Sequence, residues 1–441
     1  MSAFLKWRGA LFALACVLTT ACGGSALRLE DVTAESVPML EAENAQRPGD
    51  AQQLTRLGVG YFRANRYTEA RVALDSAVEL APQSGIAAIY LGMTAEAQGE
   101  FPAARAAYER YLTIGRSNEL KRSARQRLAL VGRRELEYQA RQALAQESTL
   151  TQEPAQLNAI AVMPFSYTGT NAEIAPLTRG FAQLIVTDLA KSRQVTVLER
   201  ERMQAMVDEM RLGETERADP ANAARSGRLI RAGRVVQGSL TDRDSDLRVD
   251  AAVVDVATTG IATSANREDQ LSRLFDLEKA LVLQIFEGLG IQLTDAERAE
   301  IEQRPTQNLQ AFLAWSRGLE AEDRGDYAGA RDLFEQATRL DPSFVSAQQS
   351  AQAAGELTAA SQQTSADVDA TVTRNAQSET SAAPTRDALA AGAGSVAPST
   401  VNGVEDASQP APTPRERNDS DPVVTPGPAA RGTIVIVIRR P

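Results

Sequence analysis

A pattern of small and large apolar residues repeats with a period of 34 residues between positions 51 and 112. The matching pairs are Leu57 and Leu91, Gly58 and Gly92, Tyr67 and Phe101, Ala70 and Ala104, Arg71 and Arg105, and Leu74 and Tyr108. The spacing puts a small residue on each of two antiparallel helices where they cross. It predicts helix-turn-helix units that bury their apolar faces only against a neighbour. A third copy, from Gly318 to Pro342, keeps the same offsets.

This repeat resembles the tetratricopeptide pattern. The first copy matches it at Leu57, Gly58, Tyr61, Ala70, Leu74, Ala77 and Pro82. We therefore expect two repeats and a capping helix in residues 50–147, and a C-terminal repeat in residues 305–354.

The resemblance implies that the inner face of the first helix in each repeat binds other proteins. Carried over residue by residue, that face presents Gln52, Thr55, Val59, Phe62, Arg63, Ile86, Ile89, Met93 and Glu96. The alternative is that the two repeats are only a spacer or packing platform, because stable arrays usually need about three repeats.

Between residues 157 and 300 the pattern changes to short apolar runs that alternate with helical spacing. The predicted strands are 159–165, 195–198, 235–240 and 247–256, and the predicted helices are 174–191, 202–210, 223–232 and 271–289. The last two strands form a hairpin, with a loop at Thr241–Asp246. This order predicts a compact α/β domain with a mixed sheet. The fold class is α/β plus all-α.

Three segments of this domain resemble the curli production assembly/transport component (CsgG) family and the related flagellar and TolB-like periplasmic domains. They are the strand Ile160–Phe165, the segment Val197–Glu209 and the segment Ala232–Leu240, which follow one another in the family's order. The resemblance implies a CsgG-like α/β domain over 157–300, flanked by the helical tetratricopeptide repeats.

The same resemblance implies a lipoprotein that self-associates into a secretion channel in the outer membrane. A membrane-spanning hairpin needs at least ~20 residues. Here the Thr241–Asp246 loop has six polar residues, and Asn266–Asp269 leads directly into a predicted helix. The expected function is therefore support of assembly or transport of envelope or secreted components through protein-protein interactions. The alternative is a tetratricopeptide adaptor or scaffold lipoprotein with no transport role.

The chain begins with the layout of a cleaved export signal. Lys6 and Arg8 precede the apolar run 10–18, and small residues lead to Cys22. This layout resembles a bacterial lipoprotein signal, although Thr19 occupies the position where that family prefers Leu. The alternative is an ordinary signal with a chance cysteine.

The lipoprotein interpretation divides the N-terminal region into a signal peptide at 1–21, a lipid-modified Cys22 and a linker over 22–49. In such lipoproteins, a non-acidic residue after the cysteine implies sorting to the outer membrane, and Gly23 fits. We therefore expect a lipid-anchored protein on the periplasmic side of the outer membrane.

The C-terminal region contains almost no large apolar residues over 355–431, which predicts a disordered linker. A β-branched run in residues 432–441 then predicts a C-terminal strand, because such a run is an aggregation hazard unless it pairs with a sheet edge. The strand-pairing candidates are Ile434, Val435, Ile436, Val437 and Ile438. They either dock on this chain's own sheet or add to a partner or neighbouring subunit.

Composition limits the chemistry. The chain has no histidine, and no thiol remains after lipidation, which excludes His-based or thiolate metal sites, a Cys nucleophile and a Ser-His-Asp triad. The net charge of −10 argues against a nucleic-acid partner. Asp242–Asp246 lacks the later glycine and acid of a calcium loop, and Glu199 and Glu201 alternate with arginines that pair with them. We predict no catalytic residue, cofactor or metal site; the partners are other proteins and the membrane.

Overall fold

The computed structural model describes residues 28–150, 156–243 and 246–380. The predicted signal peptide, the Cys22 anchor, the segment 381–431 and the strand at 432–441 lie outside these residues. No helix in the described part of the chain combines the length and the hydropathy of a membrane span.

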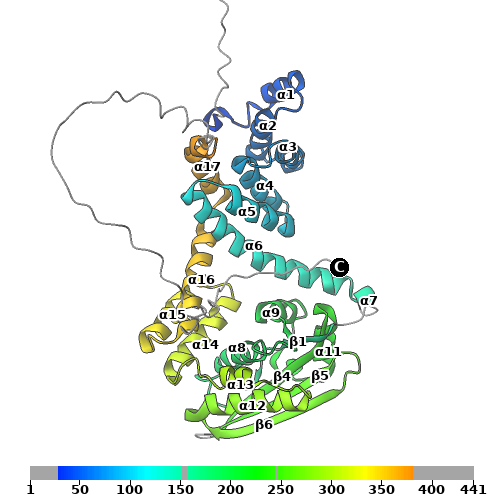
Figure 1. Cartoon of the computed structure of the whole chain (residues 1–441), viewed down its shortest axis with the longest axis vertical. Helices are drawn as coiled ribbons and strands as arrows, with labels where there is room; N and C mark the ends of the chain where they lie inside the picture. The colour runs from blue at the N-terminus through cyan, green and yellow to red at the C-terminus, as the bar shows by residue number, and fades with distance from the viewer. Residues whose placement is uncertain (1–27, 151–155, 244–245, 381–441) are drawn as a thin grey trace, which may run out of the picture. The chain divides into compact units, whose positions relative to one another are not determined.

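The N-terminal described segment is helical (Figure 1). Its elements are a 3-10 turn at Leu29–Asp31 and the helices α1 (Val37–Gln46), α2 (Ala51–Arg63), α3 (Tyr67–Leu80), α4 (Gly85–Ala97), α5 (Phe101–Ile114), α6 (Asn118–Ala145) and α7 (Glu147–Leu150). Helices α2 and α3 pack as one pair and α4 and α5 as the next. A Cβ at Gly58 would lie 2.5 Å from Leu74 Cγ, and one at Gly92 would lie 2.7 Å from Tyr108 Cε1. The small residue predicted at each helix crossing is confirmed.

The prediction of a linker over 22–49 is wrong for the part that the structure describes. Leu29, Val32 and Leu40 are buried there. A Cβ at Gly60 of α2 would lie 3.1 Å from Leu40 Cδ1 and 3.3 Å from Val37 Cγ2, so α1 packs closely on α2. The physical reason is that the first repeat has no neighbour on its N-terminal side, and α1 covers that apolar surface.

The middle segment contains a mixed sheet with the strand order β3-β1-β4-β5-β6, and β2 pairs with β4. The strands are β1 (Gln156–Val162), β2 (Ser166–Tyr167), β3 (Thr196–Val197), β4 (Ala232–Arg243), β5 (Asp246–Asp255) and β6 (Ile261–Gln270). Strand β1 runs parallel to β3 and β4, and β5 is antiparallel to β4 and β6. The predicted mixed sheet is confirmed.

Helices cover both faces of this sheet. They are α8 (Leu177–Leu189), α9 (Arg200–Glu209), α10 (Glu214–Arg217), α11 (Pro220–Ile230), α12 (Leu274–Gly288) and α13 (Asp295–Ile301), with a 3-10 turn at Leu271–Arg273 before α12. Ile160 and Val162 of β1 share an apolar cluster with α8 and α12. Ala161 and Met163 share another with α9 and α11. Because successive residues of a strand point to opposite faces, the continuous apolar run of β1 is explained by burial on both sides.

Two predictions for the hairpin region are wrong. The expected loop at Thr241–Asp246 is largely strand, since the β4–β5 ladder continues through Thr241↔Arg248 to Arg243↔Asp246. Strand β6 was not predicted, and of its ten residues only Ala265 is buried. Hydrogen bonds to the backbone of β5 hold this strand in place. Because its side chains are mostly exposed, the sequence shows no alternation of apolar and polar residues here.

The C-terminal described segment is again helical, with α14 (Leu309–Asp323), α15 (Tyr327–Leu340), α16 (Val345–Gln362) and α17 (Ser365–Thr380). Helices α14 and α15 pack together where the third repeat is expected, and a Cβ at Gly318 would lie 2.4 Å from the Phe334 ring. The disordered linker predicted from residue 355 is wrong as far as residue 380. Leu357, Val368 and Val372 are buried there, because the two N-terminal repeats and α6 supply apolar neighbours that composition alone does not reveal.

Glycine 233 of β4 is expected to be intolerant of a side chain. A Cβ there would lie 2.5 Å from the backbone oxygen of Gln156 and 2.7 Å from Leu157 Cα, and neither atom can move aside by side-chain rotation. Gly233→Ala should therefore lower the free energy of unfolding by about 1–3 kcal/mol in urea titrations. The matched control is Gly132→Ala in α6, where a Cβ meets no atom within 4 Å and helix propensity should add about 0.5–1 kcal/mol. Equal effects of the two changes would contradict the prediction.

Candidate functional site

The chain's own helix α17 covers the inner face of the N-terminal repeats (Figure 1). Val368, Val372 and Ala376 lie four residues apart on one side of α17, and all three are buried. They share an apolar cluster with α2 and α4. The predicted face residues in that cluster are Val59, Phe62, Ile86, Ile89 and Met93. We call the surface under α17, made of these residues with Arg63, Tyr90 and Tyr111, the repeat face.

The sequence predicted this face as a binding surface, and in the structure most of its residues are buried. Of the nine predicted residues, Gln52 is exposed, Arg63 is half-buried and the others are buried. Thr55 donates its hydroxyl to the Ala51 carbonyl oxygen at 2.7 Å within α2. The recognition of a partner by these residues stays a prediction.

Arg63 holds one end of α17. Its Nε and Nη2 donate to Asp369 Oδ1 at 3.0 and 2.9 Å, and Nη2 also donates to Thr373 Oγ1 at 2.8 Å. Its Nη1 donates to two carbonyl oxygens of the segment before α1. The Tyr90 hydroxyl donates to the same Asp369 carboxylate. Burial, reinforced by the charge of Asp369, raises the pKa of Tyr90, so the phenol remains a donor.

Glu379 holds the other end of α17. Its Oε1 accepts hydrogen bonds from the Tyr111 hydroxyl at 2.8 Å, the Ser117 amide at 2.7 Å and the Arg116 amide at 3.1 Å. These amides immediately precede α6, and a helix N-terminus favours negative charge. A Cβ at Gly85 would lie 2.4 Å from Glu379 Oε2, so this glycine leaves room for the carboxylate.

Glu96 of α4 forms hydrogen bonds and ion pairs with residues of α5 and α6. Its carboxylate accepts hydrogen bonds from the Tyr108 hydroxyl, Arg127 Nε and Arg134 Nη1, each at 3.0 Å. Arg127 also donates to the Gln363 carbonyl oxygen at 2.8 Å, in the link between α16 and α17. The predicted partner contact at Glu96 is thus a buried ion pair that joins α4, α5 and α6.

Asp369 and Glu379 were not among the predicted site residues. The segment that contains them was judged by its overall composition, in which polar and small residues dominate. A local signal was present: the four-residue spacing of Val368, Val372 and Ala376, which is typical of one helix face.

A second group of buried charges joins the helical repeats to the α/β domain. Arg200 of α9 donates through Nη1 to Asp323 Oδ1 of α14 at 2.7 Å, and its side chain is only 1% exposed. Arg179 Nε of α8 lies 3.2 Å from Asp323 Oδ2. Arg133 of α6 pairs with Glu322 of α14. These pairs connect four helices of the two regions.

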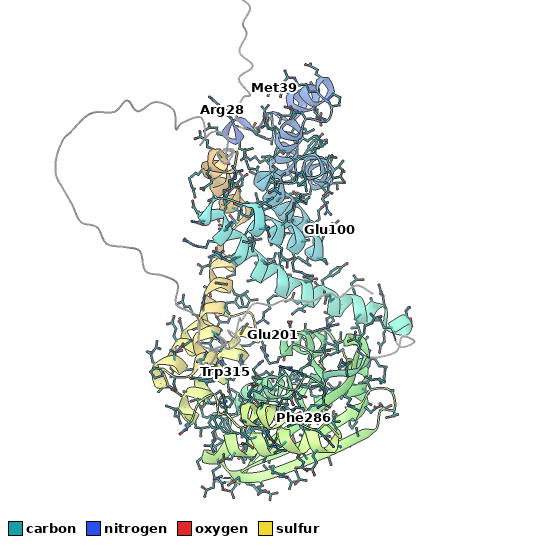
Figure 2. All side chains as sticks on the ribbon, in the orientation of Figure 1. Arg28, Met39, Glu100, Glu201, Phe286 and Trp315 are labelled. Carbon is teal, nitrogen blue, oxygen red and sulfur yellow. The ribbon has the colours of Figure 1, made fainter. Side chains whose placement is uncertain are left out.

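Glu201 of α9 belongs to the same group and is labelled in Figure 2. Its Oε1 accepts from Arg200 Nη2 at 3.2 Å. Burial alone would raise the pKa of Glu201, but the charges of Arg200 and Arg133 hold it below its usual value. The carboxylate is therefore ionised and paired, which suits a structural role.

Two families match this chain. Residues 141–271 match the curli production assembly/transport component CsgG, and residues 55–119 match the tetratricopeptide repeat. The chain carries a CsgG-family domain and tetratricopeptide repeats. The CsgG match runs from the end of α6 through β6 and contains all three segments that carried the resemblance in sequence.

No curated protein matches the chain. Among solved structures, the LpoB C-terminal domain from Salmonella enterica is similar at 15% identity, with a TM-score of 0.21. The similarity covers 28% of this chain and 91% of that one. The CsgG-family domain and the repeats themselves indicate an envelope-associated role in protein-protein interaction.

Within the described residues, no group of three or more His, Cys, Asp or Glu side chains is arranged to hold a metal ion. Asp242, from the segment that resembles the start of a calcium loop, accepts from the Tyr167 hydroxyl and from the Thr170 amide at 2.8 Å. These contacts tie the β4 end to the loop after β2.

Proposed function

We propose that this chain is a lipoprotein, anchored through Cys22 at the periplasmic side of the outer membrane, that supports assembly or transport of envelope or secreted components through protein-protein interactions. The observation that carries the proposal is the presence of a CsgG-family domain and tetratricopeptide repeats in one chain. The family resemblance adds self-association of the CsgG-family domain.

The connection between the two regions supports this proposal. Helix α6 packs against α5 of the repeats and against α9 of the CsgG-family domain, and α16 packs against α6. The buried pairs of Arg200 with Asp323 and of Arg133 with Glu322 reinforce this joint. A partner bound at the repeats would therefore be connected to the CsgG-family domain by packed helices and not by a flexible linker.

A second function, an adaptor with no transport role, is favoured by one observation. The β4–β5 ladder closes at Arg243↔Asp246, so two residues connect these strands, and five connect Asp255 to Ile261 of β6. These connections are far shorter than the ~20 residues that a membrane-spanning hairpin needs. They suit a supporting or adaptor protein better than the wall of a channel.

The proposal is tested in cells that make the wild-type chain, no chain, or the Cys22→Ala variant. We expect a defined set of outer-membrane or secreted proteins to be lost without the chain and restored by the wild type. Cys22→Ala should leave the chain in the soluble periplasmic fraction and restore little. Cys16→Ala, a change in the apolar run of the predicted signal, is the matched control and should behave as wild type.

Two results would contradict the proposal separately. An unchanged set of envelope and secreted proteins in cells without the chain would rule out the transport role and leave the adaptor. A Cys22→Ala chain that remained in the outer-membrane fraction would rule out this anchor.

A further inference from the structure

Helix α17 has a sequence that forms helices poorly by itself. Ten of its sixteen residues are Ser, Thr, Asp, Asn or Val, which all rank low in intrinsic helix propensity. An isolated helix of this length is marginal in water even with favourable residues. The contacts with the repeat face therefore hold this segment in its helical form.

Helix α17 also buries little apolar side-chain surface against the repeats. Val368, Val372 and Ala376 are its buried apolar residues, and none of them is large. The repeat face beneath them is made of larger side chains, including Phe62, Ile89 and Met93. Because both valines are fully buried, larger residues at these positions would overpack the contact, so the polar contacts determine which helices bind.

Two polar sites on the repeat face each bind one carboxylate of α17, and together they fix the position of the helix along the face. One is Arg63 with the Tyr90 hydroxyl, which binds Asp369. The other is the Tyr111 hydroxyl with the two amides before α6, which binds Glu379. The two carboxylates are ten residues apart in sequence, or about 15 Å along a helix axis. The face thus selects a helix with acids at this separation and apolar residues between them.

We propose that the repeat face binds a helix of a partner protein with this chemistry, an acidic amphipathic helix with carboxylates ten residues apart, and that α17 occupies the face until such a helix displaces it. The proposal deepens the proposed function, because it names the partner class of the repeats. It assigns α17 the role of a competitor within the same chain.

A second copy's α17 is a poorer occupant than a partner helix. Two residues, Gln363 and Thr364, join α16 to α17, so the chain's own α17 is present at a high effective concentration. Thr364 and Asp367 also cap α17 through hydrogen bonds of 2.8 and 3.2 Å between the side chain of one and the amide of the other. An identical helix from another chain gains no contact that α17 lacks. Only a better-fitting helix competes effectively.

The competition has a measurable consequence. The apparent affinity of a free helix is reduced by the fraction of molecules whose face is open. Val372→Asp, which puts a carboxylate at a fully buried position of α17, should open the face. Ala370→Asp introduces the same side chain two residues away on the exposed side and is the matched control.

The probe is a fluorescein-labelled synthetic peptide with the sequence of residues 364–380. Fluorescence anisotropy is measured with the full mature chain. The Val372→Asp chain should bind this peptide about tenfold or more tightly than the wild type, and the Ala370→Asp chain should match the wild type. The same peptide with alanine in place of both acids should lose about tenfold or more in affinity.

Amide hydrogen exchange on the same samples shows whether α17 has left the repeat face. Amide hydrogen exchange of residues 365–380 should be fast in Val372→Asp and slow in Ala370→Asp. Fast exchange without tighter peptide binding would overturn the proposal. So would dimers of the Val372→Asp chain in light scattering that exclude the peptide, since the face would then serve self-association. Asp369→Asn, which keeps the shape of the side chain, should give a smaller gain in peptide affinity and replaces Val372→Asp if that chain does not fold.

The test separates this inference from the proposed function. Peptide binding by the purified chain needs neither an envelope partner nor the lipid anchor. The face can therefore fail to bind an acidic helix while the envelope phenotype persists, and it can bind the helix in a protein without any transport role.

Discussion

Replacing Asp323 with alanine is expected to lower the free energy of unfolding by about 3–5 kcal/mol. Asp323 is 6% exposed and binds Arg200, whose side chain is only 1% exposed, and Arg179 lies 3.2 Å from its second oxygen. Removing the carboxylate leaves the Arg200 guanidinium buried, with the half-exposed Glu201 as its remaining ion-pair partner. The cost arises because Arg200 loses its more deeply buried partner, and its charge cannot be rehydrated without opening the joint between α9 and α14.

Urea titration of the wild type and the variant measures this effect. The control is Asp332→Ala in α15, because Asp332 is 68% exposed and pairs with Arg331 at the surface. That change should alter the free energy of unfolding by less than about 0.5 kcal/mol. Similar effects of the two substitutions would show that the buried charges do not stabilise the joint.

The stability of the protein is expected to fall as the pH rises from about 4.5 to 8, and Glu278 of α12 is a main cause. This side chain is fully buried beside Asp188 of α8, with Lys279 Nζ 3.1 Å from its Oε2. Lys191 pairs with Asp188 at 2.7 Å, and Lys279 also pairs with Asp188. Burial, together with the charge of Asp188, raises the pKa of Glu278 from 4.5 to about 8.

The direction of this change of stability with pH follows from proton binding. Between these two values the folded chain keeps the proton on Glu278 and the unfolded chain has lost it. Unfolding therefore releases a proton, and the free energy of unfolding decreases as the pH rises. Glu278→Gln cannot ionise and should remove this slope, which makes the variant more stable than the wild type at pH 8 by at least about 1 kcal/mol.

Urea titrations at pH 5, 6, 7 and 8 test this. Glu287→Gln, an exposed position on the same helix, should leave the slope of the wild type unchanged. Parallel pH profiles for Glu278→Gln and the wild type would contradict a protonated Glu278.

The parts of the fold that the sequence predicted are those with a local periodic signal. The 34-residue spacing located the helix crossings at Gly58, Gly92 and Gly318 because packing there admits only a small residue. The apolar run at 159–165 predicted a buried strand, and β1 is buried by helices on both faces of the sheet. These features depend on residues that are close in sequence.

The parts that the sequence missed depend on distant segments. Strand β6 exists through its backbone ladder with β5, and its polar side chains give no pattern. Helix α17 is helical because a surface about 300 residues earlier in the chain covers its three small apolar residues. Five of the predicted face residues of α2 and α4 lie in one apolar cluster. The helix that covers them could not be found without the tertiary contacts of Asp369 and Glu379.

We propose that the CsgG-family domain makes this chain a self-associating assembly protein and not a lone adaptor. The most direct measurement is the mass of the detergent-solubilised mature protein by size-exclusion chromatography with light scattering, followed by negative-stain imaging of the peak. We expect a closed assembly of several chains. A monomer at every concentration would contradict it and leave the tethered repeat adaptor as the function.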